Sequence, residues 1–318
     1  MYSNIALWHL DPKHSALKEA SEVPDADTLI KTAYSLISTG TERLIACGGV
    51  PEPLHQSMTV PYMEGSLALP VKYGYSLVGE VISSTTLAQG TRVHLMHPHQ
   101  DYCSVRSFDA SVIPAEIPLK RALLASNMET VINAVWDAGI TGACRVLIAG
   151  YGSIGALLAR VCSRHLGCEV HVLENNPLKK EGIRGQGYQI ANEHSGAFDV
   201  AFHAAASSDA LQYCIDRINP ESAVIELSWY GNRKVSLSLG GSFHRDRKKI
   251  MGSQVSVIPP HKITEWDFVK RKEYAFRLLE DDFFDGLLTH EIPFADSALF
   301  FNQNRSNPLP GTGYYISY

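Results

Sequence analysis

RVLIAGYGSIGALLARVCSRHLGCEVHVLENN, residues 145–176, is the stretch that decides the fold. It begins with a short apolar run, 146–149, which is typical of a strand buried on both faces. Glycines then follow at the spacing GxGxxG, and behind them apolar residues recur on one face of a helix. These glycines are Gly150, Gly152 and Gly155, and the apolar residues are Ile154, Leu157, Leu158 and Val161. Gly167 is placed to end the helix, and a second apolar run stops at Glu174.

This order of strand, turn, helix and strand is typical of a dinucleotide-binding unit. The first glycine allows a tight turn, the second lets the backbone approach a pyrophosphate, and the third lets helix and strand pack closely. The phosphates then lie at the helix N-terminus, where free N–H groups favour negative charge. Glu174 stands where a carboxylate accepts hydrogen bonds from the adenosine ribose. The alternative is a chance glycine-rich turn, but all four elements agree with dinucleotide binding.

The acid also bears on the choice between NAD and NADP. A carboxylate repels the 2′-phosphate of NADP, and Asn175 and Asn176 bring no positive charge. Lys179 and Lys180 follow closely and could reach back toward such a phosphate. We therefore expect NAD or NADP as cofactor, with NAD favoured.

Alternating elements continue downstream. Strands are predicted at 198–202, 223–229, 235–239 and 254–258, and a helix at 207–218 with Ser207 or Ser208 as its N-cap. This predicts an α/β fold with a doubly wound parallel sheet of the Rossmann type. Residues at the strand ends should lie beside the cofactor, although plain packing explains some small residues equally well. The predicted cofactor-binding residues are Gly150, Gly152, Ser153, Ile154, Gly155, Glu174, Asn175, Ala205, Ser228 and Trp229.

Composition sets limits on function. The chain has 318 residues, enough for two domains, and its net charge of −5 offers no basic field for nucleic acid or an anionic membrane. It lacks a run of 18 apolar residues and a secretory signal, so we expect no membrane segment. The six cysteines form no CxxC pair, which fits a reducing cytoplasm. A small-molecule substrate is the expected partner.

The segments outside the parallel sheet read differently. Residues 1–117 are rich in proline and glycine, with short strands predicted at 73–82 and 91–96, as in an irregular antiparallel β domain. A helix at 266–279 and strands at 287–294 and 311–318 close the chain. The predicted domains are 1–117 for the β domain, 118–259 for the dinucleotide domain, and 260–318 for a return to the first.

Several motifs together resemble the medium-chain dehydrogenase/reductase superfamily, over essentially the whole chain. They are PVKYGYSLVGEV (70–81), GTRV (90–93), RVLIAGYGSIG (145–155), SFHRDRKKIMGSQVS (242–256) and LLTHEIPFADSALFF (287–301). STGTE (38–42) is similar to the subgroup that contains bacteriochlorophyllide dehydrogenase. The resemblance implies a GroES-like β-barrel domain, a Rossmann domain with the cofactor in the cleft between them, and an NAD(P)-dependent oxidoreductase of the alcohol dehydrogenase type. It also implies a homodimer through an edge strand, for which 235–239 is a candidate.

The chain departs from the zinc-binding members of this superfamily. Where they carry an early cysteine ligand, it has Ser38 or Thr39, and where they carry a histidine, it has Tyr75. Neutral hydroxyls are poor zinc ligands, and Glu129 near the third position cannot hold zinc alone. The four-cysteine structural lobe is missing as well. We therefore expect no zinc at either family site.

A histidine-rich stretch, HLMHPHQDYC (94–103), could supply a metal site of its own. If the segment is extended, His97 and His99 face one side and His94 the other. The pair would need further ligands, for which Cys103 is a candidate. The alternatives are a polar lining of the substrate cleft, a proton relay and an ordinary solvated loop.

Without zinc, the charge that develops on the substrate oxygen needs hydrogen-bond donors, or a substrate that spreads the charge itself. This points to hydride transfer to or from a carbonyl, enone or quinone. The alternatives are a zinc-dependent alcohol dehydrogenase with an atypical site and a non-catalytic dinucleotide sensor. The predicted catalytic residues are Tyr75, His97, His99, Ser38 and Thr39, each with a structural role as the alternative.

Three charged residues complete the predictions. Glu42 is expected to organise the cleft through hydrogen bonds. Arg245 and Arg247 are expected either to approach the cofactor or to lie on the solvated surface.

Overall fold

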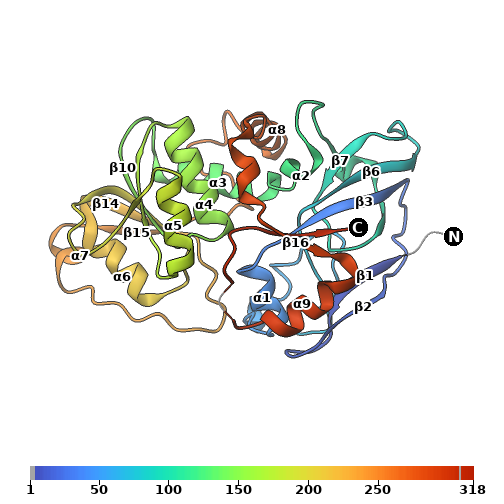
Figure 1. Ribbon diagram of the computed structural model, residues 1–318, viewed down its shortest axis with the longest axis horizontal. Coiled ribbons are helices and arrows are strands. Elements are labelled where there is room, and N and C mark those ends of the chain that lie inside the picture. The colour runs from blue at the N-terminus through green and yellow to red at the C-terminus, as the bar shows by residue number, and fades with distance from the viewer. Residues whose placement is uncertain (1–3, 308) are drawn as a thin grey trace. The chain divides into compact units, whose positions relative to one another are not determined.

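The computed structural model describes residues 4–307 and 309–318, which form two compact units (Figure 1). Unit 1 comprises Met1–Ser126, Phe276–Leu309 and Gly313–Tyr318, and unit 2 comprises Asn127–Ala275 and Pro310–Thr312. Unit 1 extends past residue 117 because Arg121 ties that segment to the C-terminal part of the same unit. The Arg121 guanidinium donates to both carboxylate oxygens of Asp285, at 2.7 and 2.8 Å, and to the Glu280 carbonyl at 2.9 Å.

Unit 2 is built on a six-stranded sheet in which every neighbouring pair is parallel. Its strands are β10 (Arg145–Ala149), β11 (Glu169–Leu173), β12 (Gln189–Ile190), β13 (Phe198–His203), β14 (Ile218–Glu226) and β15 (Lys249–Gly252). Their spatial order is β12-β11-β10-β13-β14-β15. This is the 3-2-1-4-5-6 order of a Rossmann sheet, so the predicted fold class is confirmed. The order reverses between β10 and β13, where such sheets bind ligands at the carboxyl ends of their strands.

Helices accompany this sheet. They are α3 (Ala125–Ala138), α4 (Ser153–Arg160), α5 (Pro177–Gly185), α6 (Ser208–Arg217), α7 (Ser242–Arg245) and α8 (Phe268–Leu278). Of these, α4, α6 and α8 match predicted helices, while α5 and α7 were not predicted. Ser207 caps α6 by accepting a hydrogen bond from the Ala210 amide, and Asn176 caps α5 in the same way. Leu211 and Ile215 of α6 pack on Leu147 and Phe198 of the sheet in one buried core.

Two predicted strands of unit 2 are wrong. Residues 235–239 and 254–258 are not strands, and the sixth strand is β15, which pairs with β14. In 235–239, Val235 and Leu237 pack on the hydrophobic core, while the Ser238 amide donates to Gln212 Oε1 at 2.7 Å. The alternating pattern therefore reflects a segment lying against α6, outside the sheet.

Unit 1 is a β domain with two sheets. The seven-stranded sheet has the order β16-β17-β3-β6-β7-β9, with β8 also paired to β3, and the four-stranded sheet has the order β2-β1-β5-β4. Apart from the parallel pair β16–β17, its ladders are antiparallel. The N-terminal strands are β1 (Ile5–His9), β2 (Ser15–Glu19), β3 (Thr28–Ile37), β4 (Glu64–Gly65), β5 (Val71–Lys72), β6 (Leu77–Ser84), β7 (Arg92–Leu95), β8 (Tyr102–Val105) and β9 (Ser111–Val112).

The end of the chain completes this unit. Strands β16 (His290–Pro293) and β17 (Tyr314–Ser317) join the large sheet, where β17 pairs with β3. Its helices are α1 (Thr41–Ala46), α2 (Leu119–Ala122) and α9 (Ser297–Asn304), and α9 contacts β1 and β2 (Figure 1).

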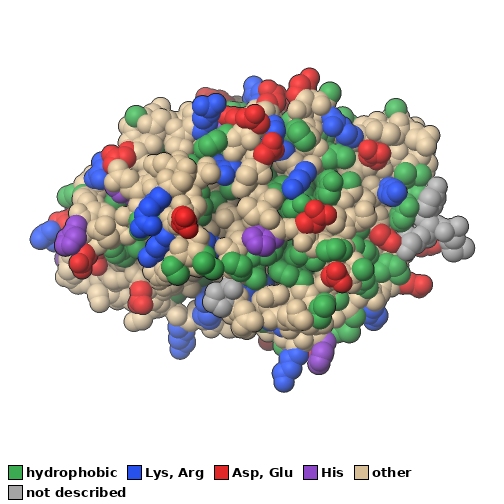
Figure 2. All heavy atoms as spheres, viewed as in Figure 1, with side chains coloured by type: hydrophobic (Ala, Val, Ile, Leu, Met, Phe, Trp, Pro, Cys, Tyr) green, Lys and Arg blue, Asp and Glu red, His purple; other side chains and the backbone are tan. Residues whose placement is uncertain are grey.

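Within the described residues, no helix is both long and apolar enough to cross a bilayer. Acidic and basic side chains are interspersed on the face drawn in Figure 2, in keeping with the small net charge of −5.

In the glycine turn after β10, Gly155 leaves no room for a side chain. A Cβ on residue 155 would lie 1.9 Å from the Gly150 carbonyl oxygen, so only glycine lets α4 approach this turn. Gly150 has φ +96°, where an L side chain is strained. Gly152 differs, because a Cβ there would meet no atom within 4 Å. The first and third glycines are thus required by the fold, and the second leaves open space.

Gly155→Ala is expected to lower the free energy of unfolding of unit 2 by about 1–3 kcal/mol, because the added methyl forces helix and turn apart. Gly152→Ala is the matched control, with an ordinary φ of −87° and open space, and should change it by less than about 0.5 kcal/mol. Urea unfolding followed by tryptophan fluorescence measures both. Equal midpoints for the two variants would contradict this account of the turn.

Candidate functional site

The glycine turn after β10, the N-terminus of α4 and Glu174 together form a candidate dinucleotide site, called the dinucleotide cradle below. Glu174, just beyond β11, accepts hydrogen bonds from the Tyr151 amide at 3.0 Å and the Asn176 amide at 2.9 Å. These bonds join the glycine turn to the start of α5. The open space at Gly152 lies at the N-terminus of α4, where free N–H groups and the helix dipole attract anions. The residues therefore fit a dinucleotide pyrophosphate, with Glu174 available to a ribose.

A lysine reaches back to the same turn. Lys179 Nζ donates to the Tyr151 carbonyl at 3.2 Å and is partly buried. Burial lowers the pKa of Lys179, and the nearby Glu174 charge opposes that shift. The cradle thus holds a cation as well as an anion, which bears on the discrimination between NAD and NADP.

The other predicted cofactor residues line the neighbouring strand ends. A Cβ on Gly150 would lie 3.0 Å from the Ala205 Cα, so the turn and the end of β13 are adjacent. Ser228 Oγ, beyond β14, accepts from the Ala206 amide at 3.0 Å, and Trp229 follows it, partly exposed. The remaining predicted residues, Ser153, Ile154 and Asn175, lie close to the turn in sequence or in structure. Ser153 and Ile154 begin α4, with Ser153 Oγ donating to the Thr312 carbonyl at 2.9 Å, and Asn175 is exposed.

Sequence reasoning missed a buried cluster at this edge of the sheet. His203 ends β13, and its Nδ1 donates to Glu226, the register partner that ends β14, at 2.9 Å. Tyr230 also donates to Glu226, at 3.1 Å. Burial by itself would raise the pKa of Glu226, but the hydrogen bonds and charge interaction from His203 and the hydrogen bonds from Ser228 together lower it. Because the three residues lie up to 27 positions apart, no local sequence pattern joins them. Their positions near or just beyond the ends of predicted strands were the one signal that could have indicated the cluster.

The two arginines lie on the surface. Arg245 pairs with Asp246 and Arg247 with Glu221, and both arginine side chains are 78% exposed. The structure thus agrees with the solvated-surface alternative.

In unit 1, the predicted residues Tyr75, Ser38 and His99 belong to one hydrogen-bonded chain. The Tyr75 hydroxyl donates to Ser38 Oγ at 2.6 Å, and the Ser38 amide donates to Glu42 Oε1 at 2.7 Å. The other Glu42 oxygen accepts from His99 Nε2 at 2.7 Å. Beyond it, His99 Nδ1 lies 2.7 Å from Ser35 Oγ. Glu42 therefore organises the group through hydrogen bonds.

This hydrogen-bonded chain is largely buried. The Glu42 and His99 side chains are both 0% exposed, so their polar atoms depend on the hydrogen bonds within the chain. Burial raises the pKa of Tyr75 to about 12, against the hydrogen bond with Ser38, which lowers it. Tyr75 therefore stays protonated near neutral pH and acts as a hydroxyl rather than a base. Thr39 lies in the turn next to Ser38, between β3 and α1.

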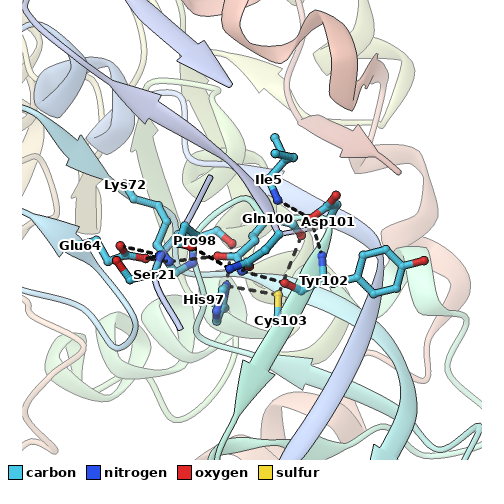
Figure 3. Close-up of polar contacts among 12 residues, drawn as sticks. Ile5, Ser21, Glu64, Lys72, His97, Pro98, Gln100, Asp101, Tyr102 and Cys103 are labelled. Carbon is cyan, nitrogen blue, oxygen red and sulfur yellow. Dashed lines mark hydrogen bonds and ion pairs between the residues drawn. The ribbon is translucent and has the colours of Figure 1, made fainter. Parts of the chain in front are cut away.

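His97 belongs to a different environment (Figure 3). Its Nδ1 donates to the Pro98 carbonyl at 2.8 Å and lies 3.5 Å from Cys103 Sγ, and its ring stacks on Tyr62. Burial lowers the pKa of His97 to about 3, so it is neutral and cannot relay protons near pH 7. Figure 3 also shows the buried Lys72, which donates to Gln100 at 3.0 Å.

The three histidines of the cluster therefore have separate partners. The segment containing His97 and His99 is not a strand, and His94 Nε2 lies 3.1 Å from Ser76 Oγ. Nothing in these contacts gathers the imidazoles around one point.

Known proteins share this architecture. No protein-family model matches the chain. 2-Desacetyl-2-hydroxyethyl bacteriochlorophyllide A dehydrogenase of Rhodobacter capsulatus is 25% identical over 291 residues, covering 86% of this chain and 84% of that protein. The solved structure of L-idonate 5-dehydrogenase from Escherichia coli has a TM-score of 0.78 at 16% identity, over 99% of this chain and 98% of that one.

Two further solved structures contain cofactors. An Escherichia coli protein described as a short chain alcohol dehydrogenase, in complex with NADH, has a TM-score of 0.75 at 14% identity. A Sinorhizobium meliloti protein described as a zinc-binding dehydrogenase, bound to NADP, has a TM-score of 0.74 at 16% identity. Each comparison covers 99% of both chains. The chain has the medium-chain dehydrogenase/reductase fold. The relative and these neighbours support an NAD(P)-dependent oxidoreductase of the alcohol dehydrogenase type.

The zinc of many medium-chain dehydrogenases does not fit the residues found here. Ser38, Thr39 and Tyr75 offer hydroxyls, which are poor zinc ligands at neutral pH. Glu129 pairs with Arg271 at 3.3 Å and with Lys272. Across residues 4–307 and 309–318, no three His, Cys, Asp or Glu side chains are grouped so as to hold a metal ion.

The buried neutral His97 predicts a pH-dependent stability. Its folded pKa of about 3 lies below the ordinary value of 6.5, so the unfolded chain binds more protons and stability falls as pH drops below 6.5. This imidazole alone should cost about 2 kcal/mol between pH 8 and pH 5. His97→Gln is expected to remove this contribution to the dependence of the unfolding free energy on pH.

His194→Gln, which removes an exposed imidazole, is the control. Urea unfolding at pH 8, 7, 6 and 5 measures the slope, and equal slopes for His97→Gln and the unsubstituted chain would refute the assignment.

Proposed function

We propose that this protein is a zinc-independent, NAD(P)-dependent oxidoreductase that interconverts a secondary alcohol and a ketone, or reduces a related enone or quinone. The observation that carries the proposal is the Tyr75–Ser38 hydroxyl pair, backed by the buried Glu42–His99 pair, at the positions where the zinc enzymes carry metal ligands. The non-catalytic sensor and the zinc-dependent enzyme are outcomes of the tests below.

The dinucleotide cradle supplies one half of the chemistry. When bound, the nicotinamide donates or accepts the hydride. The chain's part is to bind the pyrophosphate at the N-terminus of α4 and to hold the ribose at Glu174. The Glu174 carboxylate is already oriented by the Tyr151 and Asn176 amides, so little ordering remains to be done on binding.

The hydroxyl pair supplies the other half. Because Tyr75 donates its proton to Ser38 Oγ, the Ser38 proton remains to be donated to a substrate oxygen. A hydroxyl that accepts one hydrogen bond becomes a better donor of the next. The Ser38–substrate bond would strengthen as negative charge develops on that oxygen. The bond from the Ser38 amide to Glu42 holds the Ser38 backbone for this task.

The substrate class is proposed from the curated relative. Its name describes a dehydrogenase acting on a hydroxyethyl group, which fits the secondary alcohol and ketone pair. A ketone has partial negative charge on its carbonyl oxygen, and an alkoxide has a full negative charge on its oxygen. In both cases a single hydrogen bond from Ser38 can stabilise that charge.

NAD is proposed as the preferred cofactor. Glu174 is held by two amides and repels a 2′-phosphate, while Lys179 is already engaged with the Tyr151 carbonyl. A cytoplasmic homodimer also stays a prediction. β15, whose Ile250 and Met251 side chains are exposed, replaces 235–239 as the edge strand that would pair.

NAD is expected to bind at least tenfold more tightly than NADP, and Glu174→Gln should narrow that ratio about tenfold by removing the repelling charge. Lys179→Met should leave the binding of NAD and of NADP within about twofold, because Lys179 is engaged with the Tyr151 carbonyl rather than with a 2′-phosphate. Gly152→Val, which fills the open space at the turn, should weaken both. Isothermal calorimetry measures all four proteins. No heat from either nucleotide, or tighter binding of NADP, would contradict the assignment.

Tyr75→Phe is expected to lower turnover about 100-fold, because Ser38 loses the hydrogen bond that orients its hydroxyl and strengthens it as the donor to the developing oxyanion. NAD affinity should be unchanged, since the substitution lies in unit 1. Tyr73→Phe, which removes a hydroxyl two residues away, is the matched control and should retain full turnover. Turnover is followed as NADH absorbance with secondary alcohols, ketones, enones and quinones.

Three results would overturn the proposal in different ways. Stoichiometric zinc in the purified enzyme, with activity lost to a chelator, would establish the zinc-dependent alternative. Tight nucleotide binding without turnover of the whole panel would establish the sensor. Full turnover of Tyr75→Phe would remove the hydroxyl pair from the reaction.

A further inference from the structure

Three cysteines of unit 2 meet at the amino ends of β10 and β11. Cys144 precedes β10 and Cys168 precedes β11, and their sulfur atoms lie 3.6 Å apart. Cys162 is the third, in the π-helical turn Val161–His165, and its carbonyl accepts from the Cys168 amide at 2.9 Å. All three are free thiols. This cluster is at the edge of the sheet opposite the glycine turn, so the dinucleotide cradle does not use it.

We propose that Cys144 and Cys168 are a peroxide-responsive pair that closes reversibly into a disulfide. The Glu169 amide donates to the Cys144 carbonyl at 2.9 Å, so the β10–β11 register continues to this pair. Neighbouring strands lie about 4.8 Å apart, inside the 4.4–6.8 Å range of Cα separations in disulfides. The sulfur atoms need to approach from 3.6 Å to about 2.05 Å, which side-chain rotation can supply.

The surroundings favour Cys168 as the thiol that reacts first. The Cys162 thiol donates a hydrogen bond to the Cys168 sulfur, and this bond lowers the pKa of Cys168 to about 6, against burial, which raises it. Thiolates, not thiols, are the nucleophiles in such chemistry. Burial raises the pKa of Cys144 to about 12, so it stays a thiol until its partner is oxidised. Cys168 itself is buried, whereas Cys144 beside it is partly exposed, so peroxide has to reach Cys168 past Cys144.

The reaction balances with hydrogen peroxide as oxidant. The Cys168 thiolate attacks one peroxide oxygen and breaks the O–O bond, giving a sulfenic acid at Cys168 and releasing hydroxide. The Cys144 sulfur then attacks the Cys168 sulfur, and the sulfenic hydroxyl leaves with the Cys144 proton as water. In sum, two thiols and one peroxide give one disulfide and two waters. A dithiol reductant reverses the change.

The chain itself makes the test direct, because trypsin places each cysteine in a separate peptide: 122–145, 161–164 and 165–179. The full protein is treated with hydrogen peroxide, blocked with N-ethylmaleimide, digested and examined by mass spectrometry. We expect peptide 122–145 joined to peptide 165–179, with two of the six thiols lost and both regained with dithiothreitol.

Variants locate the first step. Cys144→Ser should stop at a sulfenic acid on Cys168, trapped by dimedone, and Cys168→Ser should lose both products. Cys47→Ser, which removes a distant thiol of unit 1, should still form the disulfide. Circular dichroism confirms that each variant is folded. Absence of the joined peptide in the unsubstituted protein would overturn the proposal, as would a joined pair of 161–164 and 165–179 in its place.

Discussion

The Gly150 carbonyl occupies the space that a side chain at position 155 would need, and this contact fixes the dinucleotide half of the protein. It holds the first turn of α4 directly against the end of β10, so the helix N-terminus opens at the strand edge. Glu174 and Lys179 then bind the amide and the carbonyl of the same residue, Tyr151. One short backbone approach therefore places an anion site, a carboxylate and an ammonium group within a single turn.

Unit 1 has a comparable dependence on one buried pair. Glu42 and His99 are wholly removed from solvent, and the Glu42 side chain accepts hydrogen bonds from His99 and the Ser38 amide, as a buried polar group requires. Ser38 and Tyr75 are positioned as a result, and in the proposed function their neutral hydroxyls do the work of metal ligands. A hydroxyl pair offers directional donors of fixed geometry, whereas a metal offers a full charge. A hydroxyl pair would therefore suit a substrate whose oxygen develops only part of a negative charge in the transition state.

Much of this could be predicted where the signal is local. The GxGxxG turn, α4 and α6 follow from hydrophobic period and capping residues close in sequence. The strand predicted at 235–239 was wrong because an alternating pattern of apolar and polar residues also occurs in an extended segment that packs on a helix. β15, with only two apolar residues, gave too weak a pattern.

The pairing of side chains in the candidate site was harder to predict from the sequence. Glu42 and His99 are 57 residues apart, and only tertiary structure separates His99 from His97, two positions earlier, with its different partners. The histidines of one loop looked equivalent in sequence because their chemistry is the same. Burial and neighbours, which no local pattern encodes, made one of them part of the hydroxyl chain and the other an inert core residue.

The pairing of β17 with β3 has a consequence for biosynthesis. Tyr314 is the register partner of Ile37, so the large sheet of unit 1 cannot close until the ribosome has made β17, about 280 residues after β3. The parallel sheet of unit 2 is complete by residue 252 and can form first. The early strands of unit 1 must wait with an open edge through that interval, when they are most exposed to aggregation. Nascent chains of this protein should therefore depend on chaperones chiefly through their first hundred residues.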